Sequence, residues 1–179
     1  MHGPVLTAKR VTLRPHRQED APDFVRMLSN PHVTRWLQRT TPPTLEQEQA
    51  WIAAREHDPN SIGWSIELDG LCIGSVGFDE IDWHNQWATV GIFIGHPEIW
   101  GTGIGHEVAL LADYYAFTDQ PWRLVKSGYL APNVASEKLQ ASIGLREVGR
   151  WPGAYWRDGQ YVDHVLTALT REERDRRYS

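Results

Sequence analysis

The sequence predicts a mixed α/β protein of the α+β class, in which about four helices flank a central, mixed and largely antiparallel sheet of about six to seven strands. Segments with period-two alternation recur along the chain, and Asp69-Gly70 joins two of them as a hairpin turn. Helical patterns interrupt these segments singly and in pairs, unlike a strict βαβ repeat. The predicted order is β-α-α-β-β-β-α-β-α-β-β, within one domain that spans residues 1–179.

The elements carry recognisable start and stop signals. Asp20 precedes a helical pattern as a potential N-cap, and Asn30-Pro31 ends that helix. Thr44 and Gln47 form a capping-box pattern before a second helix. The expected strands are residues 9–15, 61–68, 71–82, 87–95, 122–131, 145–151 and 160–169. The expected helices are residues 18–31, 44–57, 104–117 and 133–143. The charged tail from about residue 170 is expected to form a frayed helical turn.

Composition narrows the classes of function. The formal net charge is −5 and no long basic run occurs, so nucleic acid is not an expected partner. The single cysteine, Cys72, excludes an internal disulfide, and no stretch approaches the roughly 20 apolar residues of a membrane span. We therefore expect a cytoplasmic protein that does not bind a membrane, and the sequence allows either a monomer or a homodimer. The histidines show no ligand spacing, so no metal site is expected.

Residues 97–117 place three glycines directly before a helical pattern. A P-loop would need a lysine after its last glycine, whereas His106 follows Gly105. A dinucleotide fingerprint would need a glycine where His106 or Val108 stands. These mismatches disfavour a nucleotide-binding hydrolase. The loop remains compatible with an anion held by N–H groups at a helix start, or with a plain turn.

Two motifs resemble those of a known family. Residues 100–105 (WGTGIG) match the pattern Gln/Arg-x-x-Gly-x-Gly/Ala, with Trp100 in the first position. Residues 133–149 resemble an Asn-x-x-Ser/Ala helix followed by Gly-Phe, with Leu145 in place of the phenylalanine. The chain thus resembles the GNAT superfamily of N-acetyltransferases, in the branch of the ribosomal-protein-alanine N-acetyltransferases, over nearly its whole length. This resemblance implies a GNAT-like fold and direct transfer of an acetyl group from acetyl-CoA to a primary amine in a ternary complex.

The resemblance also implies how acetyl-CoA would bind. N–H groups of the glycine loop would hold the pyrophosphate at the positive end of the helix. The strand Ile92–Ile94 would pair with the pantetheine arm, and an N–H of Phe93 or Ile94 would stabilise the oxyanion that develops on the thioester. Asn133 would cap its helix and help to hold the pantetheine. The expected acetyl-CoA residues are Ile92, Phe93, Ile94, Trp100, Gly101, Thr102, Gly103, Ile104, Gly105 and Asn133.

The catalytic residues depart from the family pattern. The branch's Ala-Glu-Ile-Gly stretch reads Ala-Thr-Val-Gly at residues 88–91, without the glutamate. The candidate bases are therefore Glu80, Asp82, His84 and Asp163. Asp82 and Asp163 are the two that we select, although structural roles stay open for both. Gln140 stands where many members have a tyrosine acid, so Ser136 is the expected proton donor to the leaving thiolate.

Aromatic residues predict where the acceptor binds. Tryptophan and tyrosine rings can enclose an apolar or cationic amine, although they serve equally well in ordinary packing. The expected acceptor residues are Trp36, Trp83, His84, Trp151 and Tyr155. The acceptor would be a protein N-terminus or a small-molecule amine. The alternative is a protein that binds acyl-CoA without catalysis, as a sensor or as a partner subunit.

Overall fold

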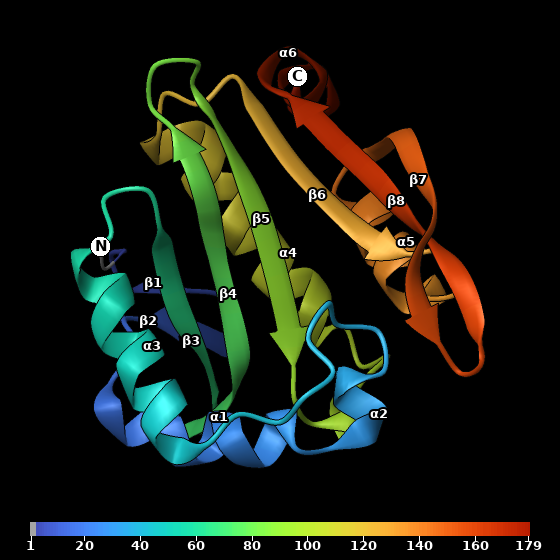
Figure 1. The fold of residues 1–179 in the computed structure, drawn as a ribbon. Helices are drawn as coiled ribbons and strands as arrows, with labels where there is room; N and C mark the ends of the chain where they lie inside the picture. The colour runs from blue at the N-terminus through green and yellow to red at the C-terminus, as the bar shows by residue number, and fades with distance from the viewer. Residues whose placement is uncertain (1–2) are drawn as a thin grey trace.

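A computed structural model describes residues 3–179, in which eight strands form one sheet in the order β1-β2-β3-β4-β5-β6-β8-β7 (Figure 1). Neighbouring strands are antiparallel except β5 and β6, which are parallel. The strands are β1 (Leu6–Thr7), β2 (Val11–Arg14), β3 (Ile62–Leu68), β4 (Leu71–Asp82), β5 (Trp87–Ile94), β6 (Leu124–Leu130), β7 (Arg146–Arg157) and β8 (Gln160–Thr170). The predicted mixed, largely antiparallel sheet is confirmed, and the short β1 is the strand that the sequence did not predict.

Helices cover both faces of the sheet (Figure 1). They are α1 (Ala21–Leu28), α2 (Pro31–Thr34), α3 (Leu45–His57), α4 (Ile104–Tyr114), α5 (Val134–Ser142) and α6 (Arg171–Tyr178). The four predicted helices correspond to α1, α3, α4 and α5. The described chain adds the single turn α2 and the C-terminal α6, and α4 continues as a π-helical turn over Tyr115–Asp119.

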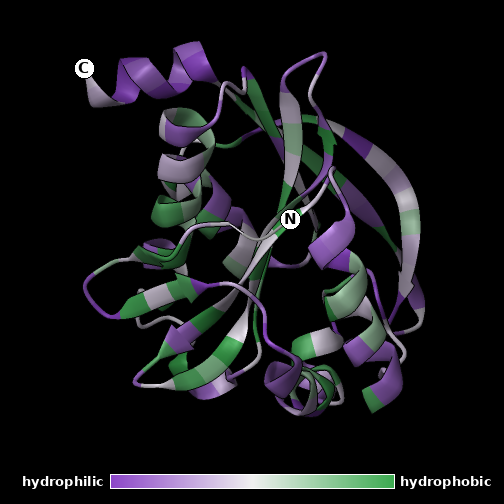
Figure 2. Cartoon of the chain, turned by 90° about the vertical axis from the view of Figure 1, so that its left-hand side faces the viewer, coloured by the Kyte–Doolittle hydropathy of each residue, from purple (hydrophilic) through white to green (hydrophobic). Residues whose placement is uncertain are grey.

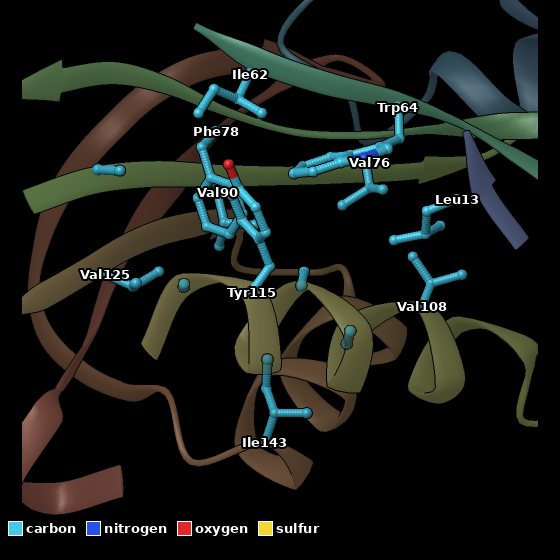
Figure 3. Packing of buried hydrophobic residues seen from close by; sticks show 14 of the residues in the cluster. Leu13, Ile62, Trp64, Val76, Phe78, Val90, Val108, Tyr115, Val125 and Ile143 are labelled. Atoms are coloured by element: carbon cyan, nitrogen blue, oxygen red, sulfur yellow. The ribbon is translucent and has the colours of Figure 1, made fainter. Parts of the chain in front are cut away.

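The core lies between the sheet and α4. Figure 3 shows Trp64, Val76 and Phe78 of the strands above Val108 of α4 and the following Tyr115. We call this side of the sheet the α4–α5 face. A smaller apolar cluster joins α1 and α3 to the other side, which we call the α1–α3 face. Its buried members are Ala21, Phe24, Met27, Ile52 and Cys72, with Phe93 of β5 packed against them.

The local signals in the N-terminal half are mostly confirmed. Asp69 and Gly70 both have positive φ, 50° and 80°, as the predicted two-residue hairpin turn requires. Thr44 and Gln47 form the predicted capping box, in which the Gln47 N–H donates to Thr44 Oγ1 at 3.2 Å.

The predicted capping role of Asp20 is wrong. The residue stands at the N-cap position, but its side chain accepts no hydrogen bond from the first turn of α1. Instead, two guanidinium nitrogens of Arg14 and the hydroxyl of Ser65 donate to its carboxylate, each at 2.8 Å or less. Asp20 is buried beside a cation, and a charge-assisted, bidentate pair is stronger than a cap bond.

The charged tail is more ordered than a frayed turn. The helix α6 begins with a capping box in which Thr170 Oγ1 accepts from the N–H of Glu173 at 3.2 Å. Arg174 forms a salt bridge with Asp113 of α4 at 3.2 Å. Figure 2 shows the helix that ends at the C-terminus as largely hydrophilic, so it is held by polar contacts.

The parallel pair β5 and β6 separates after a short paired stretch. Its register joins Trp87–Thr89 to residues 124–126, and Ser127 Oγ then donates to the carbonyl of Val90 at 3.0 Å. Beyond this point the two strands diverge (Figure 1), while β6 stays paired with β8. We call the unpaired stretch, residues 91–94 of β5 against residues 127–130 of β6, the β5–β6 split.

Candidate active site

The glycine loop joins the open end of β5 to α4 in a conformation that favours glycine. Gly101 and Gly103 have φ of +77° and +88°, and Gly103 is the N-cap residue of α4. A Cβ on Gly101 would meet no atom within 4 Å. The positive φ therefore explains this glycine, and the space beside it is left open by the protein.

Backbone N–H groups of this loop are available to a ligand. Within residues 3–179, the N–H groups of residues 101 and 103–105 donate to no backbone acceptor outside the helix, and no side chain caps α4. The first N–H of the helix that bonds back is that of Glu107, to the carbonyl of Gly103 at 3.1 Å. Unpaired N–H groups at a helix start carry partial positive charge and bind anions.

Two side chains hold the loop in place. Arg10, just before β2, donates to the carbonyl of Thr102 at 3.1 Å, and its backbone N–H donates to Glu107 Oε2 at 3.0 Å. The indole N–H of Trp100 donates to the carbonyl of Ile94 at 3.0 Å. The loop is thereby fixed to β2 on one side and to the end of β5 on the other.

The backbone of β5 presents every second N–H to the split. The N–H of Gly95 donates to Ile73 of β4 at 2.8 Å, and these groups alternate along an antiparallel ladder. The N–H of Phe93 therefore points to β4, whereas those of Ile92 and Ile94 point toward β6. Of the two predicted oxyanion donors, Ile94 is the one that faces the split.

The helix α5 places a polar network at the other edge of the split. Asn133 Oδ1 caps α5 by accepting the N–H of Ser136 at 3.2 Å. The buried Gln140 donates from Nε2 to the carbonyl of Gly128 at 3.1 Å and to Ser136 Oγ at 3.2 Å, and accepts from Thr167 Oγ1. Because a carbonyl only accepts, the Gly128 bond identifies the amide nitrogen. Ser136 Oγ is then an acceptor from Gln140, and its own proton is free to be donated elsewhere.

Three predicted residues lie away from the split. Asp82, Trp83 and His84 form the turn between β4 and β5, at the end of β5 that is paired with β6. The N–H and side-chain amide of Asn85 donate to Asp82 at 2.7 and 2.8 Å, and these bonds lower the pKa of that carboxyl. The indole of Trp83 donates to the carbonyl of Pro59 at 3.0 Å.

Asp163 lies on β8, one strand beyond β6. Its carboxylate accepts the N–H of Gly153 at 2.9 Å and lies 3.8 Å from a guanidinium nitrogen of Arg150. These contacts hold a bulged part of β7 against β8, which gives Asp163 a structural role in the hairpin.

The tip of the β7–β8 hairpin docks on the segment that follows α2. Arg157, 9% exposed, donates to the carbonyls of Arg35 at 3.1 Å and Leu37 at 2.6 Å. Arg35 pairs with Asp158 at 2.8 Å, and its guanidinium lies 4.7 Å from the ring centre of Trp36. A polar cleft of about 410 Å³ lies at this junction. Its lining residues are Pro31, His32, Thr34, Arg35, Thr40, Arg157 and Asp158.

Two predicted acceptor residues meet on one imidazole. The rings of Trp151 and Tyr155 on β7 each lie with their centres 5.4 Å from that of His164 on β8. Trp151 is 56% exposed, so much of its side chain is open to a ligand. The structure thus brings Trp151 and Tyr155 together, and places Trp36 where the docked hairpin tip meets the α2–α3 connection.

Metal-binding clusters and membrane-spanning helices are both absent from residues 3–179. Between residues 3 and 179, no group of three or more His, Cys, Asp or Glu side chains is arranged to bind a metal ion. In the same part of the chain, no helix has the length and apolar character that crossing a membrane requires.

Sequence reasoning missed three residues of this region. Arg10 and Arg157 act through partners far along the chain, so no local pattern reveals them. Gln140 did carry a signal, because a buried amide stands where the resembling family often has tyrosine. Its role depends on Gly128 of β6 and Thr167 of β8, which lie beside α5 only in the folded protein.

Comparisons with known proteins agree with this geometry. The family model described as "Acetyltransferase (GNAT) domain" matches residues 10–146. Among curated proteins, the chain is 28% identical to the uncharacterized N-acetyltransferase YoaA of Bacillus subtilis and 25% identical to the uncharacterized N-acetyltransferase p20 of Bacillus licheniformis. Each match spans 94% of this chain and 97% of the relative.

Solved structures show the same fold at lower identity. A spermidine N-acetyltransferase from Vibrio cholerae, in complex with CoA and spermine, superposes with a TM-score of 0.85 at 19% identity over 93% of this chain and 99% of that one. RimJ of Mycobacterium smegmatis, in complex with CoA-disulfide, superposes with a TM-score of 0.81 at 23% identity over 96% and 87%.

Proposed function

The chain belongs to the GNAT acetyltransferase family, and on that premise we propose that it transfers the acetyl group of acetyl-CoA to a primary amine by direct attack in a ternary complex. The observation that carries the proposal is the coincidence of the β5–β6 split with the open N–H groups of the glycine loop at its end. A split of this kind offers an extended ligand a strand edge, and the loop offers its phosphates a positive helix end.

The donor side follows from the backbone. Residues 101 and 103–105 would hold the pyrophosphate through their unpaired N–H groups, and Ile92 would pair with the amides of the pantetheine arm. The N–H of Ile94 would then stabilise the negative charge that develops on the thioester oxygen, since it faces the split. Asn133 would help to fix the other edge by holding the first turn of α5.

Ser136 is the proposed proton donor to the departing thiolate. Gln140 donates to its Oγ, which leaves the hydroxyl proton for a second partner. Thiolate is a good leaving group, so we assign most of the rate enhancement to positioning of donor and acceptor. The roles of Asp82 and Asp163 as bases remain predictions, and both carboxylates already accept hydrogen bonds from neighbouring residues.

The acceptor side is assigned to the β7–β8 hairpin and the segment after α2. Trp36, Trp151 and Tyr155 would contact the amine-bearing molecule, while Trp83 and His84 lie at the paired end of β5. The two fold relatives that carry CoA groups are a spermidine N-acetyltransferase and a RimJ, which supports a polyamine or a protein N-terminus as acceptor classes.

The experiment that tests this function measures release of free CoA thiol from acetyl-CoA with a panel of amines. The panel contains a polyamine, a peptide with a free N-terminus, an amino acid and an aminoglycoside, and thermal shift with acetyl-CoA and with ATP runs beside it. We expect stabilisation by acetyl-CoA alone and thiol release with at least one amine. Stabilisation without any thiol release would identify a non-catalytic acyl-CoA binder, and absence of stabilisation by acetyl-CoA would contradict the proposal.

A further inference from the structure

His164 reaches from β8 across β6 to the edge of the β5–β6 split. Its register partners are Leu130 on β6 and Trp151 on β7, so it stands in the middle of three strands. A Cβ on Gly128 would lie only 2.5 Å from His164 Nε2. The missing side chain at Gly128 therefore allows the imidazole to lie over β6, the strand that borders the split.

His164 lies on the opposite face of the sheet from Ser136. Thr167 bonds to Gln140 on α5, so the odd-numbered residues of this part of β8 face α5. Side chains alternate along a strand, which places His164 on the α1–α3 face. Gly128 is thus contacted from both sides: Gln140 binds its carbonyl, and the imidazole covers its Cα.

The imidazole is buried and unpaired. His164 is 7% exposed, and its Nδ1 makes no hydrogen bond within the described chain. Burial lowers the pKa of His164 below its usual value. The groups that face it are Gly128 and Leu130 from β6 and Trp151 and Tyr155 from β7, of which only the Tyr155 phenol can titrate. No charged partner therefore fixes the imidazole in its protonated form.

We propose that His164 is the general base that takes the proton from the acceptor amine, an inference that rests on the proposed acetyl transfer. The ammonium nitrogen gives one proton to Nε2, and its freed electron pair forms the C–N bond to the thioester carbonyl carbon while the carbonyl π pair moves onto oxygen. As the carbonyl re-forms, the C–S bond breaks with its electron pair on sulfur, which takes the hydroxyl proton of Ser136. The second proton of the nitrogen passes through water to Ser136 Oγ, and Nε2 releases its proton to solvent, so the products are the amide, the CoA thiol and one proton. Base and acid so act from opposite faces of the split, and the apolar rings of Trp151 and Tyr155 flank the incoming amine.

The test compares His164→Gln with the matched control His57→Gln, an exposed histidine at the end of α3. With an alkylamine acceptor, we expect kcat of His164→Gln to fall by about 100-fold or more, the usual scale of general-base catalysis, with KM for acetyl-CoA unchanged. With an acceptor whose amine is already neutral at the assay pH, the loss should shrink to less than about tenfold. His57→Gln should match the wild type on both acceptors.

The pH dependence of kcat/KM in the wild type tests the proposal without any substitution. Since the amine can arrive as an ammonium ion, kcat/KM should stay level below the amine pKa and fall only below the pKa of His164, which burial holds under its usual value. In His164→Gln the rate should instead rise about tenfold per pH unit up to the amine pKa, because the amine must arrive neutral. In His164→Ala, added imidazole should restore part of the rate.

The outcomes separate the two proposals. A wild type that transfers acetyl groups, with His164→Gln within threefold of it, would overturn the role of His164 and leave the proposed function standing. Equal losses with both acceptors would also overturn it, since a merely structural histidine would affect them alike. If the variants fail to fold, a wild-type kcat/KM that is not level between about pH 6.5 and the amine pKa overturns it as well. A wild type without any acetyl transfer would instead contradict the proposed function.

Discussion

The two sides of the β5–β6 split are built in different ways. On the proposed donor side, the glycine loop, the start of α4 and the capped start of α5 use backbone groups and near neighbours along the chain. On the proposed acceptor side, the β7–β8 hairpin docks on the segment after α2 through Arg157, whose bond to Arg35 joins residues 122 positions apart. The donor side depends on backbone conformation and the acceptor side on long-range side-chain contacts.

This difference explains what each side reveals in a sequence. A loop that offers N–H groups needs particular φ values, and glycine at residues 101 and 103 records that need directly. A pocket held by a buried arginine that donates to carbonyls far along the chain produces no local motif. In the sequence, Arg157 is only a single arginine within an aromatic strand. Substitutions that change either the backbone conformation or a side-chain contact, but not both, therefore test this difference.

The largest effect is expected in the buried ion pair beside α1, on the α1–α3 face. Asp20→Asn should lower the free energy of unfolding at pH 7 by about 3 kcal/mol, because Arg14 and Ser65 stay buried without the carboxylate that both bind, while Glu67 still pairs with Arg14 at 2.7 Å. Chemical denaturation of both proteins at pH 7 and at pH 3 or below measures this. A loss under about 1 kcal/mol at pH 7 would show that the pair contributes little.

The pH dependence of that loss has a definite sign. Burial alone would raise the pKa of Asp20, but the bonds from Arg14, Ser65 and the N–H of Arg17 outweigh it, and the pKa in the folded protein lies below its usual value. The ionised carboxylate therefore stabilises the fold above its unfolded pKa, and this contribution disappears as the pH falls through the folded pKa. The difference between wild type and Asp20→Asn should accordingly shrink in acid.

The second prediction separates backbone strain from donor binding. Gly101→Ala and Gly70→Ala place a Cβ at similar positive φ, +77° and +80°, with no protein atom within 4 Å in either case. Both variants should lose about 1 kcal/mol of stability from strain. Only Gly101→Ala should raise KM for acetyl-CoA, by about 10- to 100-fold, through lost N–H contacts to phosphate. Equal KM values in the two variants would mean that the loop does not bind the donor.

The third prediction concerns the docked hairpin. Arg157→Met keeps the side-chain stem but removes the bonds to Arg35 and Leu37, so KM for the acceptor should rise about tenfold while KM for acetyl-CoA stays constant. Steady-state kinetics with each substrate varied in turn measures the two KM values. The control is Arg176→Met on α6, whose partner Glu172 lies in an exposed pair of little energetic value.

The smallest expected effect is that of Gln140. Gln140→Leu should lower kcat about fivefold, because the Ser136 hydroxyl loses the donor that fixes its orientation. In a double-mutant cycle with Ser136→Ala, the two losses should fail to multiply, since both act through one hydroxyl. Thr167→Val removes only the bond to Gln140 Oε1 and serves as the structural control. If the two losses in kcat multiply fully, Gln140 does not act through the Ser136 hydroxyl, and its role lies in folding alone.

Much of the fold could be predicted because its signals are local. The Asp69-Gly70 turn and the Thr44 capping box depend on neighbouring residues, and both formed as predicted. Asp20 carried a local capping signal as well, but burial gave its carboxylate to Arg14 and Ser65 instead. The tail at 171–178 formed a full helix because Arg174 finds Asp113 on α4, a contact that no local pattern records.

The sequence predicts the position of the glycine loop in the fold better than the positions of the other candidate residues. Residues 100–105 lie where the motif indicates, at the open end of β5. Asp82, Trp83 and His84 were selected by residue type and by closeness in sequence to β5, but they precede its paired end. His164 carries no signal in the sequence beyond that of a histidine in an apolar strand, and only the contact with Gly128 shows how far it reaches.

The short pairing of β5 with β6 also has a mechanical meaning. Strands β1–β5 and strands β6–β8 form two half-sheets, which are joined where Trp87–Thr89 of β5 pair with residues 124–126 of β6. A donor lying in the split would pair like an additional strand and extend this connection between the two half-sheets. Acetyl-CoA would then stiffen the protein as well as supply the acetyl group, and release of CoA would loosen the two halves after each turnover.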